Sequence, residues 1–150
     1  MRYFFRYIWF SLCLFLGIQP AFALPSIIET ATITANNLPL DGQGSASIHI
    51  VKVADLELST SHPLGLTLTV GSGSIEKASG TPIAYQVTTV VDGSPPPSSA
   101  DFTTSPGSNY VVATNSAGSS SKDLYIKYTP AALQDPGAYN TSISLVVTDN

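Results

Sequence analysis

Two histidines, His49 and His62, are the only imidazole groups in the chain that could act as a catalytic base. Nucleophilic catalysis also needs a nucleophile and an orienting group beside that base. No Gly-x-Ser-x-Gly motif occurs, and the single cysteine, Cys13, lies in the apolar N-terminal segment. His49 alternates with isoleucines, as on the polar face of a strand, and His62 precedes a proline in a turn. The sequence therefore predicts no catalytic residue and a protein that is not an enzyme.

Metal sites have little support in the spacing of the ligand residues. Two histidines are too few for a closed zinc site. Asp92, Asp101 and Glu76 flank predicted loops and carry oxygen ligands of the kind that Ca²⁺ binds, but they lack the Asp-x-Asp-x-Asp spacing of a calcium loop. Asp55 and Glu57 alternate with leucines, which is typical of the solvent-facing side of a strand. We therefore expect a solvated acidic surface, with no metal ligands and no cofactor.

A glycan-binding surface would need exposed aromatic side chains. Beyond residue 23 the chain has no tryptophan and five tyrosines. Tyr110 borders a segment rich in serine and proline, and Tyr125 faces away from the apolar side of its predicted strand. These two residues are the candidate ligand contacts, with cross-strand packing as the alternative role.

The charge of the chain excludes nucleic-acid binding. Beyond residue 23 it has four lysines, no arginine and ten carboxylates, a formal charge of −6 (4 − 10). Recognition of a phosphate backbone requires a cationic surface, which scattered lysines cannot build.

Residues 1–23 have the three parts of a secretory signal peptide. Two arginines precede an apolar run over residues 8–18, and Ala21 and Ala23 supply the small residues of a cleavage site. The alternative, a membrane anchor, would need roughly 20 apolar residues. We expect cleavage after Ala23 and a mature chain, residues 24–150, that has no membrane span and no cysteine.

Alternation of apolar and polar residues dominates the mature chain, and Gly/Pro-rich turns separate the alternating stretches. This pattern predicts an all-β fold, an immunoglobulin-like antiparallel β-sandwich of about 7–8 strands in a single domain. Residues 129–134 have room for one helical turn at most. The predicted strands cover residues 27–35, 46–53, 55–60, 64–70, 83–91, 110–114, 124–128 and 139–147.

Residues 93–121 form a segment rich in serine, proline and glycine. The three prolines at 95–97 have no N–H to donate to a strand ladder, so we expect the segment at an edge or on the surface. It is either a contacting loop or a solvated connection.

Several of the predicted strands together resemble exported bacterial surface subunits. The resemblance is greatest to chaperone–usher fimbrial subunits, including the spore-coat-U-like group and the cysteine-free CFA/I-type major pilins. It covers most of residues 45–150, although no disulfide is present and the chain has no aromatic residue next to its end. The stretches that carry it are 56–60, 65–70, 82–87, 122–126 and 136–148.

The resemblance implies an incomplete sandwich that is completed by the N-terminal strand of the next subunit. Residues 25–36 would be the donor, within an N-terminal segment and linker over 24–44, although Glu29 interrupts its apolar face. The same segment could equally be the first strand of a self-contained domain. The implied donor residues are Ile27, Ala31, Ile33 and Ala35, and the implied acceptor groove is bordered by Ile48, Ile50, Ile143, Leu145 and Val147.

The expected function is that of a secreted, non-enzymatic structural or adhesive protein of the periplasm or cell surface, most concretely a fimbrial subunit. Its expected partners are further copies or other surface subunits, and a periplasmic chaperone. The alternative is a self-contained secreted module that binds a glycan or Ca²⁺.

Overall fold

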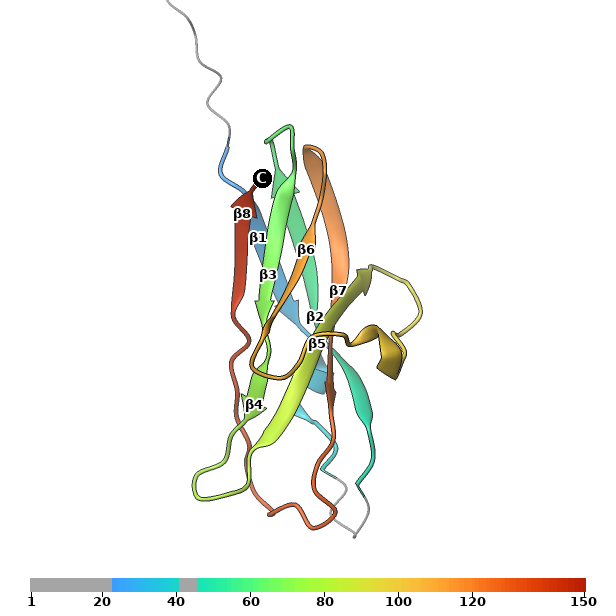
Figure 1. Cartoon of the computed structure of the whole chain (residues 1–150), viewed down its shortest axis with the longest axis vertical. Coiled ribbons are helices and arrows are strands. Elements are labelled where there is room, and N and C mark those ends of the chain that lie inside the picture. Colours follow the sequence, from blue (N-terminus) through green and yellow to red (C-terminus); the bar gives the residue numbers. More distant parts are fainter. Residues whose placement is uncertain (1–22, 41–45) are drawn as a thin grey trace, which may run out of the picture.

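Two antiparallel sheets contain all eight strands of the computed structural model, which describes residues 23–40 and 46–150 (Figure 1). One sheet has the order β1-β2-β7-β5-β4 and the other the order β6-β3-β8. The predicted all-β sandwich is thus confirmed, whereas the predicted signal peptide lies almost entirely outside the described residues. The strands are β1 (Ser26–Ala31), β2 (His49–Thr60), β3 (Leu66–Gly71), β4 (Gly73–Ile75), β5 (Ile83–Val91), β6 (Asn109–Ala113), β7 (Gly118–Tyr128) and β8 (Leu145–Asp149), and the 3-10 turns are η1 (Ile33–Asn36) and η2 (Ser99–Asp101).

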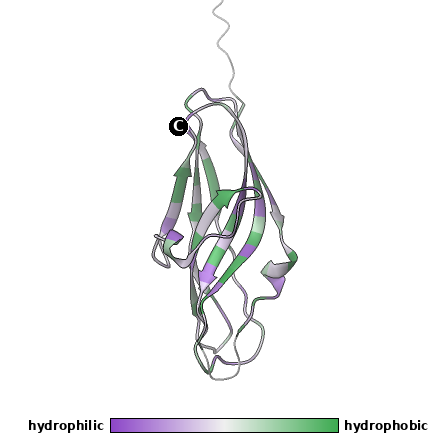
Figure 2. Ribbon diagram, turned by 90° about the vertical axis from the view of Figure 1, so that its right-hand side faces the viewer, coloured by the Kyte–Doolittle hydropathy of each residue, from purple (hydrophilic) through white to green (hydrophobic). Residues whose placement is uncertain are grey.

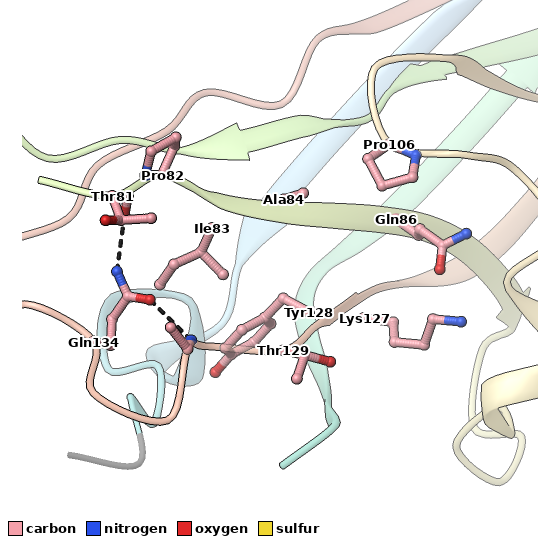
Figure 3. Close-up of a pocket in the computed structure, with 11 residues that line it drawn as sticks. Thr81, Pro82, Ile83, Ala84, Gln86, Pro106, Lys127, Tyr128, Thr129 and Gln134 are labelled. Carbon is pink, nitrogen blue, oxygen red and sulfur yellow. Dashed lines mark hydrogen bonds between the residues drawn. The ribbon is translucent and has the colours of Figure 1, made fainter. Parts of the chain in front are cut away.

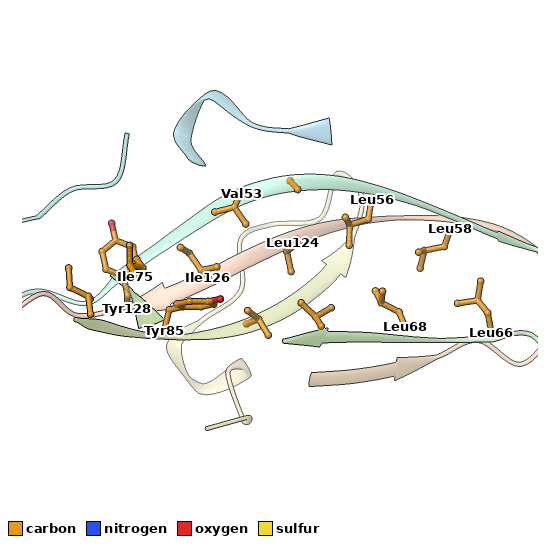
Figure 4. Close-up of a cluster of buried hydrophobic side chains, with 14 residues drawn as sticks. Val53, Leu56, Leu58, Leu66, Leu68, Ile75, Tyr85, Leu124, Ile126 and Tyr128 are labelled. Carbon is orange, nitrogen blue, oxygen red and sulfur yellow. The ribbon is translucent and has the colours of Figure 1, made fainter. Parts of the chain in front are cut away.

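The sandwich interior is built from every second side chain of the long strands (Figure 4). Leu68, Val70 and Val87 are fully buried there, and burying an aliphatic side chain of this size contributes about 1.5–3 kcal/mol. Figure 2 shows the corresponding alternation of hydrophobic and hydrophilic residues along the strands. The alternation that the sequence predicted for β3, β5 and β7 therefore marks the interior face.

A β-bulge lets two predicted strands form one continuous strand. Residues 46–53 and 55–60 were expected as separate strands, but β2 runs through both with a register shift between Lys52 and Ala54. Val53 is the extra residue, and it reverses the alternation so that Val51 and Ala54 both face the interior. The prediction of a break at this point was wrong because a bulge changes the apolar period without ending the ladder.

Two predicted strands are shorter in the structure because hydroxyl side chains bond the backbone in place of a ladder. β1 ends at Ala31, where Thr32 and Thr34 turn and donate their hydroxyls to the carbonyl oxygen of Lys52 at 2.8 and 2.6 Å. The strand predicted over 139–147 begins only at Leu145, because before it Asn140 forms just an isolated bridge with Glu76 and the Thr141 hydroxyl donates to the Ser74 carbonyl oxygen at 2.9 Å. Residues 129–134 form a turn rather than a helix.

The serine- and proline-rich segment includes a packed cap on the outer face of the larger sheet (Figure 1, yellow). Phe102 is 4% exposed, and Gln86 Nε2 on β5 donates to its carbonyl oxygen at 3.2 Å. Lys127 Nζ on β7 lies 5.2 Å from the Phe102 ring centroid and donates to the Ser99 carbonyl oxygen at 3.0 Å. The cap contacts β7 near its C-terminal end, at Lys127, and the paired Gln86 of β5, so this part of residues 93–121 is packed against the sheet.

Candidate functional site

An open edge runs along β8. Among the described residues β8 pairs only with β3, and it is the last strand of its sheet. Its core-facing residues Leu145 and Val147 pack against the core yet stay half-buried, as does Ile143 before them. Interior side chains elsewhere, such as Leu68, are fully covered. The sandwich is therefore less well covered along this edge than across its centre.

The backbone of β8 alternates in the direction of its hydrogen bonds. Gly71 N donates to the Ser144 carbonyl oxygen at 2.9 Å, and Asn150 N donates to the Gly65 carbonyl oxygen at 3.1 Å. In an antiparallel ladder, the even-numbered residues 144–150 therefore bond to β3. Leu145 and Val147 turn their N–H and C=O groups toward the open edge, where a further strand could bond to them.

A hollow of about 520 Å³ continues the open edge below β8. Its walls are residues 35–40, which follow β1, and residues 137–141, which lead to β8. Leu38, Leu40 and Ile75 give it apolar lining. We call the open edge of β8 together with this hollow the seam.

β1 forms the corresponding edge of the larger sheet, at the same side of the sandwich in Figure 1. Of its six residues only Ile27 is half-buried, and the other five are exposed. Among the residues expected to act as donor, Ala35 is half-buried, Ala31 is exposed, and Ile33 lies in η1 with 90% of its surface exposed. The predicted donor segment is thus paired with its own chain but leaves most of its apolar side chains exposed.

The residues expected to border an acceptor groove fall in two places. Ile143, Leu145 and Val147 lie together at the seam. Ile48 and Ile50 do not join them: β2 lies between β1 and β7, Ile48 is 60% exposed, and Ile50 is opposite Lys127 on the outer face. The bulge in β2 is the reason, because it places the odd-numbered residues before it on the interior side.

The two tyrosines considered as ligand contacts lie in different sheets. Tyr125 is 6% exposed, which leaves it little surface for a ligand. Tyr110 is half-buried in β6, and its hydroxyl lies 3.1 Å from Thr89 Oγ1. They do not form one glycan-binding surface.

The two histidines are also far apart. His49 begins β2 and stacks on Tyr128 with ring centroids 5.3 Å apart. His62 follows the end of β2, so a strand of twelve residues separates them, a length of about 40 Å at 3.3 Å per residue. They cannot act on one substrate within a single subunit.

Asp55, Asp92 and Asp123 bring carboxylate oxygens within 4.8 Å of one another on the outer face of the larger sheet. Lys52 Nζ lies 2.5 Å from Asp55 and 2.8 Å from Asp123, whose side chain is 4% exposed. These contacts raise the pKa of the Lys52 ammonium, that with Asp123 most strongly. Burial raises the pKa of Asp123, but the bond to Lys52 and its charge outweigh burial and lower it overall. The cluster is an ion-pair network in which the Lys52 ammonium is the cation.

Of the carboxylates that the sequence singled out for Ca²⁺, only Asp92 belongs to this cluster. Asp101 accepts from the Ser98 N–H at 2.7 Å and from the Ser98 hydroxyl, which lowers the pKa of Asp101. Glu76 is exposed and accepts from the Ser74 hydroxyl. Sequence reasoning missed Asp123, because it comes to lie opposite Asp55 only through the pairing of β2 with β7.

A second hollow, of about 360 Å³, lies beside β5 and is lined in part by Gln134 (Figure 3). Gln134 Nε2 donates to the Thr81 carbonyl oxygen at 2.8 Å and to Tyr139 Oη at 2.7 Å, and its Oε1 accepts from Ala131 N at 2.9 Å. Because these bonds tie the loop after β7 to the start of β5, the role of Gln134 here is structural.

No model of a known protein family matches the chain, and no curated protein matches it either. Within residues 23–40 and 46–150, no helix has the length and apolar character that crossing a membrane requires.

Proposed function

We propose that the protein is an exported, non-enzymatic structural subunit of a bacterial surface assembly, of the fimbrial type, joined to its neighbours by exchange of a β-strand. One observation carries the proposal: the N-terminal segment leaves Ile28 and Ile33 60% and 90% exposed in its own fold, while the seam beside β8 is incompletely covered. Exposed apolar side chains and an unpaired strand edge are a liability unless a partner covers them.

Exchange is energetically accessible to this segment. Moving β1 breaks a ladder of six residue pairs with β2, and pairing with the β8 edge of another subunit replaces it. The net gain then comes from apolar burial, because Leu145 and Val147 are half-buried before assembly. The partners would be further copies or similar subunits, and a periplasmic chaperone would cover the seam until assembly.

Replacing Ile33 with aspartate tests the donor side of the proposal. The side chain is 90% exposed, so the fold of one subunit should be unaffected. We expect the dissociation constant of the mature chain for itself to rise at least tenfold, because an added strand would bury a charge in place of an apolar side chain. Light scattering across a concentration series measures this effect. The matched control is Leu133→Asp, at a residue 83% exposed in the loop after β7; equal effects of the two variants would reject the proposal.

Replacing Val147 with proline tests the acceptor side. Its N–H points to the open edge, so proline removes a bond to an added strand and none to β3. We expect a folded subunit whose self-association is weakened at least tenfold. Val111→Pro is the control, because by the same alternation its N–H points away from β3 at the opposite edge of the sheet. Self-association that is the same in both variants would exclude β8 as the acceptor.

A further inference from the structure

The contacts that hold residues 26–36 on their own subunit are almost all polar. Besides the β1–β2 ladder, Thr32 N donates to the Val53 carbonyl oxygen at 2.9 Å, and the Thr32 and Thr34 hydroxyls donate to Lys52. Each such bond at the surface has a net value of only about 0.5–1.5 kcal/mol, since water replaces it on opening. Within residues 26–36 only Ile27 and Ala35 pack against the core, and both are half-buried. Segments with few buried apolar contacts open locally at low free-energy cost.

The next residues are anchored differently. Leu38 and Leu40 pack against the core, and Tyr128 Oη donates to the Pro39 carbonyl oxygen at 3.1 Å. The strongest apolar attachment of the N-terminal segment therefore begins just after η1. Residues 26–36 can therefore leave as a unit while residues 38–40 stay in place. Once released and extended, these eleven residues reach about 36 Å from the anchor toward another subunit.

We infer that residues 26–36 act as a latch: docked on β2 they keep the subunit in a self-contained state, and their release from β2 is the step that makes it able to assemble. The inference rests on the proposed function and adds its regulation. While β1 is docked, the N–H and C=O groups on the side of β1 that faces β2 are occupied and cannot bond to a neighbouring subunit. The partner that the released latch joins is a second copy of this chain. Residues 137–148 of the seam have no charged side chain. They therefore suit the latch, whose only charged residue is Glu29.

A reversible disulfide tests the latch directly. Ser26 and Ser59 are paired across β1 and β2, and their hydroxyl oxygens lie 2.8 Å apart, so cysteines at these positions are close enough to join. Since the mature chain has no other cysteine, Ser26→Cys with Ser59→Cys should oxidise cleanly. We expect the oxidised mature chain to stay monomeric at concentrations where the unmodified chain assembles, and reduction to restore assembly. Assembly of the oxidised form at the unmodified level would overturn the latch.

The matched control is Ser59→Cys with Ser119→Cys, which joins β2 to β7 and leaves β1 free; it should assemble whether oxidised or reduced.

Hydrogen exchange provides a second measurement that needs no crosslink. Amides of residues 26–36 should exchange at least tenfold faster than those of β7, and equal protection of the two segments would also overturn the inference. If Ile33→Asp abolishes assembly but the oxidised latch does not, the latch is rejected while the proposed function stands. If neither has an effect, both are rejected.

Discussion

Replacement of Lys52 by methionine should lower the free energy of unfolding at pH 7 by about 1–3 kcal/mol, which lies between the values for exposed and buried ion pairs because Asp123 is buried while the Lys52 side chain is 30% exposed. The methionine retains most of the aliphatic length, so the loss reports the charge. Asp123, with its side chain 4% exposed, would be left beside Asp55 and Asp92 without the ammonium that now lies 2.8 Å away. Urea unfolding followed by circular dichroism measures the change.

The pH dependence of this variant should run opposite to that of the natural chain. In the natural chain the pKa of Asp123 lies below its ordinary value of 3.8, so its contribution is present above that pH and is lost as pH falls through the lowered pKa. Lys52 has a raised pKa, so its contribution is present below the ordinary value of 10.5 and is lost only as pH rises through the raised one. Without Lys52, burial and the neighbouring carboxylates would raise the pKa of Asp123. The variant should therefore gain stability as pH falls from 7 toward 4.

Two further variants distinguish the loss of the ion pair from a nonspecific effect of removing a charge. Glu57→Gln removes an exposed charge from the same strand and should change stability by less than about 0.5 kcal/mol. Adding Asp123→Asn to Lys52→Met removes the unpaired charge and should recover most of the loss. A Lys52→Met chain as stable as Glu57→Gln would show that the ion pair does not stabilise the fold.

Replacement of Gly65 by alanine should have the second large effect. The backbone there has φ +84°, and a Cβ atom would lie 2.4 Å from the Thr114 carbonyl oxygen. The left-handed conformation costs an alanine about 1–2 kcal/mol and overpacking about 1–3 kcal/mol more. Thr114 is not free to move, because its N–H donates to the Leu66 carbonyl oxygen at 2.8 Å and its hydroxyl oxygen accepts from Leu66 N at 2.9 Å.

Thermal unfolding should separate conformational strain from steric overlap at this position. Gly107 has φ +81° with nothing within 4 Å of the added Cβ, so Gly107→Ala carries the conformational cost alone. We expect the melting temperature to fall by roughly 10 °C for Gly65→Ala and by roughly 5 °C for Gly107→Ala, since 1 kcal/mol corresponds to about 3–5 °C in a domain of this size. Equal shifts would mean that the Thr114 contact relaxes without cost.

The residues that form the seam could be predicted only partly from the sequence. Leu145 and Val147 were predicted to face an acceptor groove, and the structure places them at an open edge. Ile48 and Ile50 were predicted beside them and lie elsewhere, because one bulge at Val53 reverses the side of the sheet that each residue faces. A bulge leaves only a weak mark in a sequence, since it alters the alternation by a single residue.

Local alternation determined the sandwich class and the interior faces of β3, β5 and β7, because side chains on a strand alternate whatever the strand pairs with. Contacts between residues far apart in the chain depended on the tertiary structure. Phe102 became a buried cap residue only when its segment folded over the outer face, and Lys52 met Asp123 only when β2 paired with β7. The docking of β1 on β2 also depended on the tertiary structure. Strand register is set by the whole assembled sheet rather than by the composition of either segment.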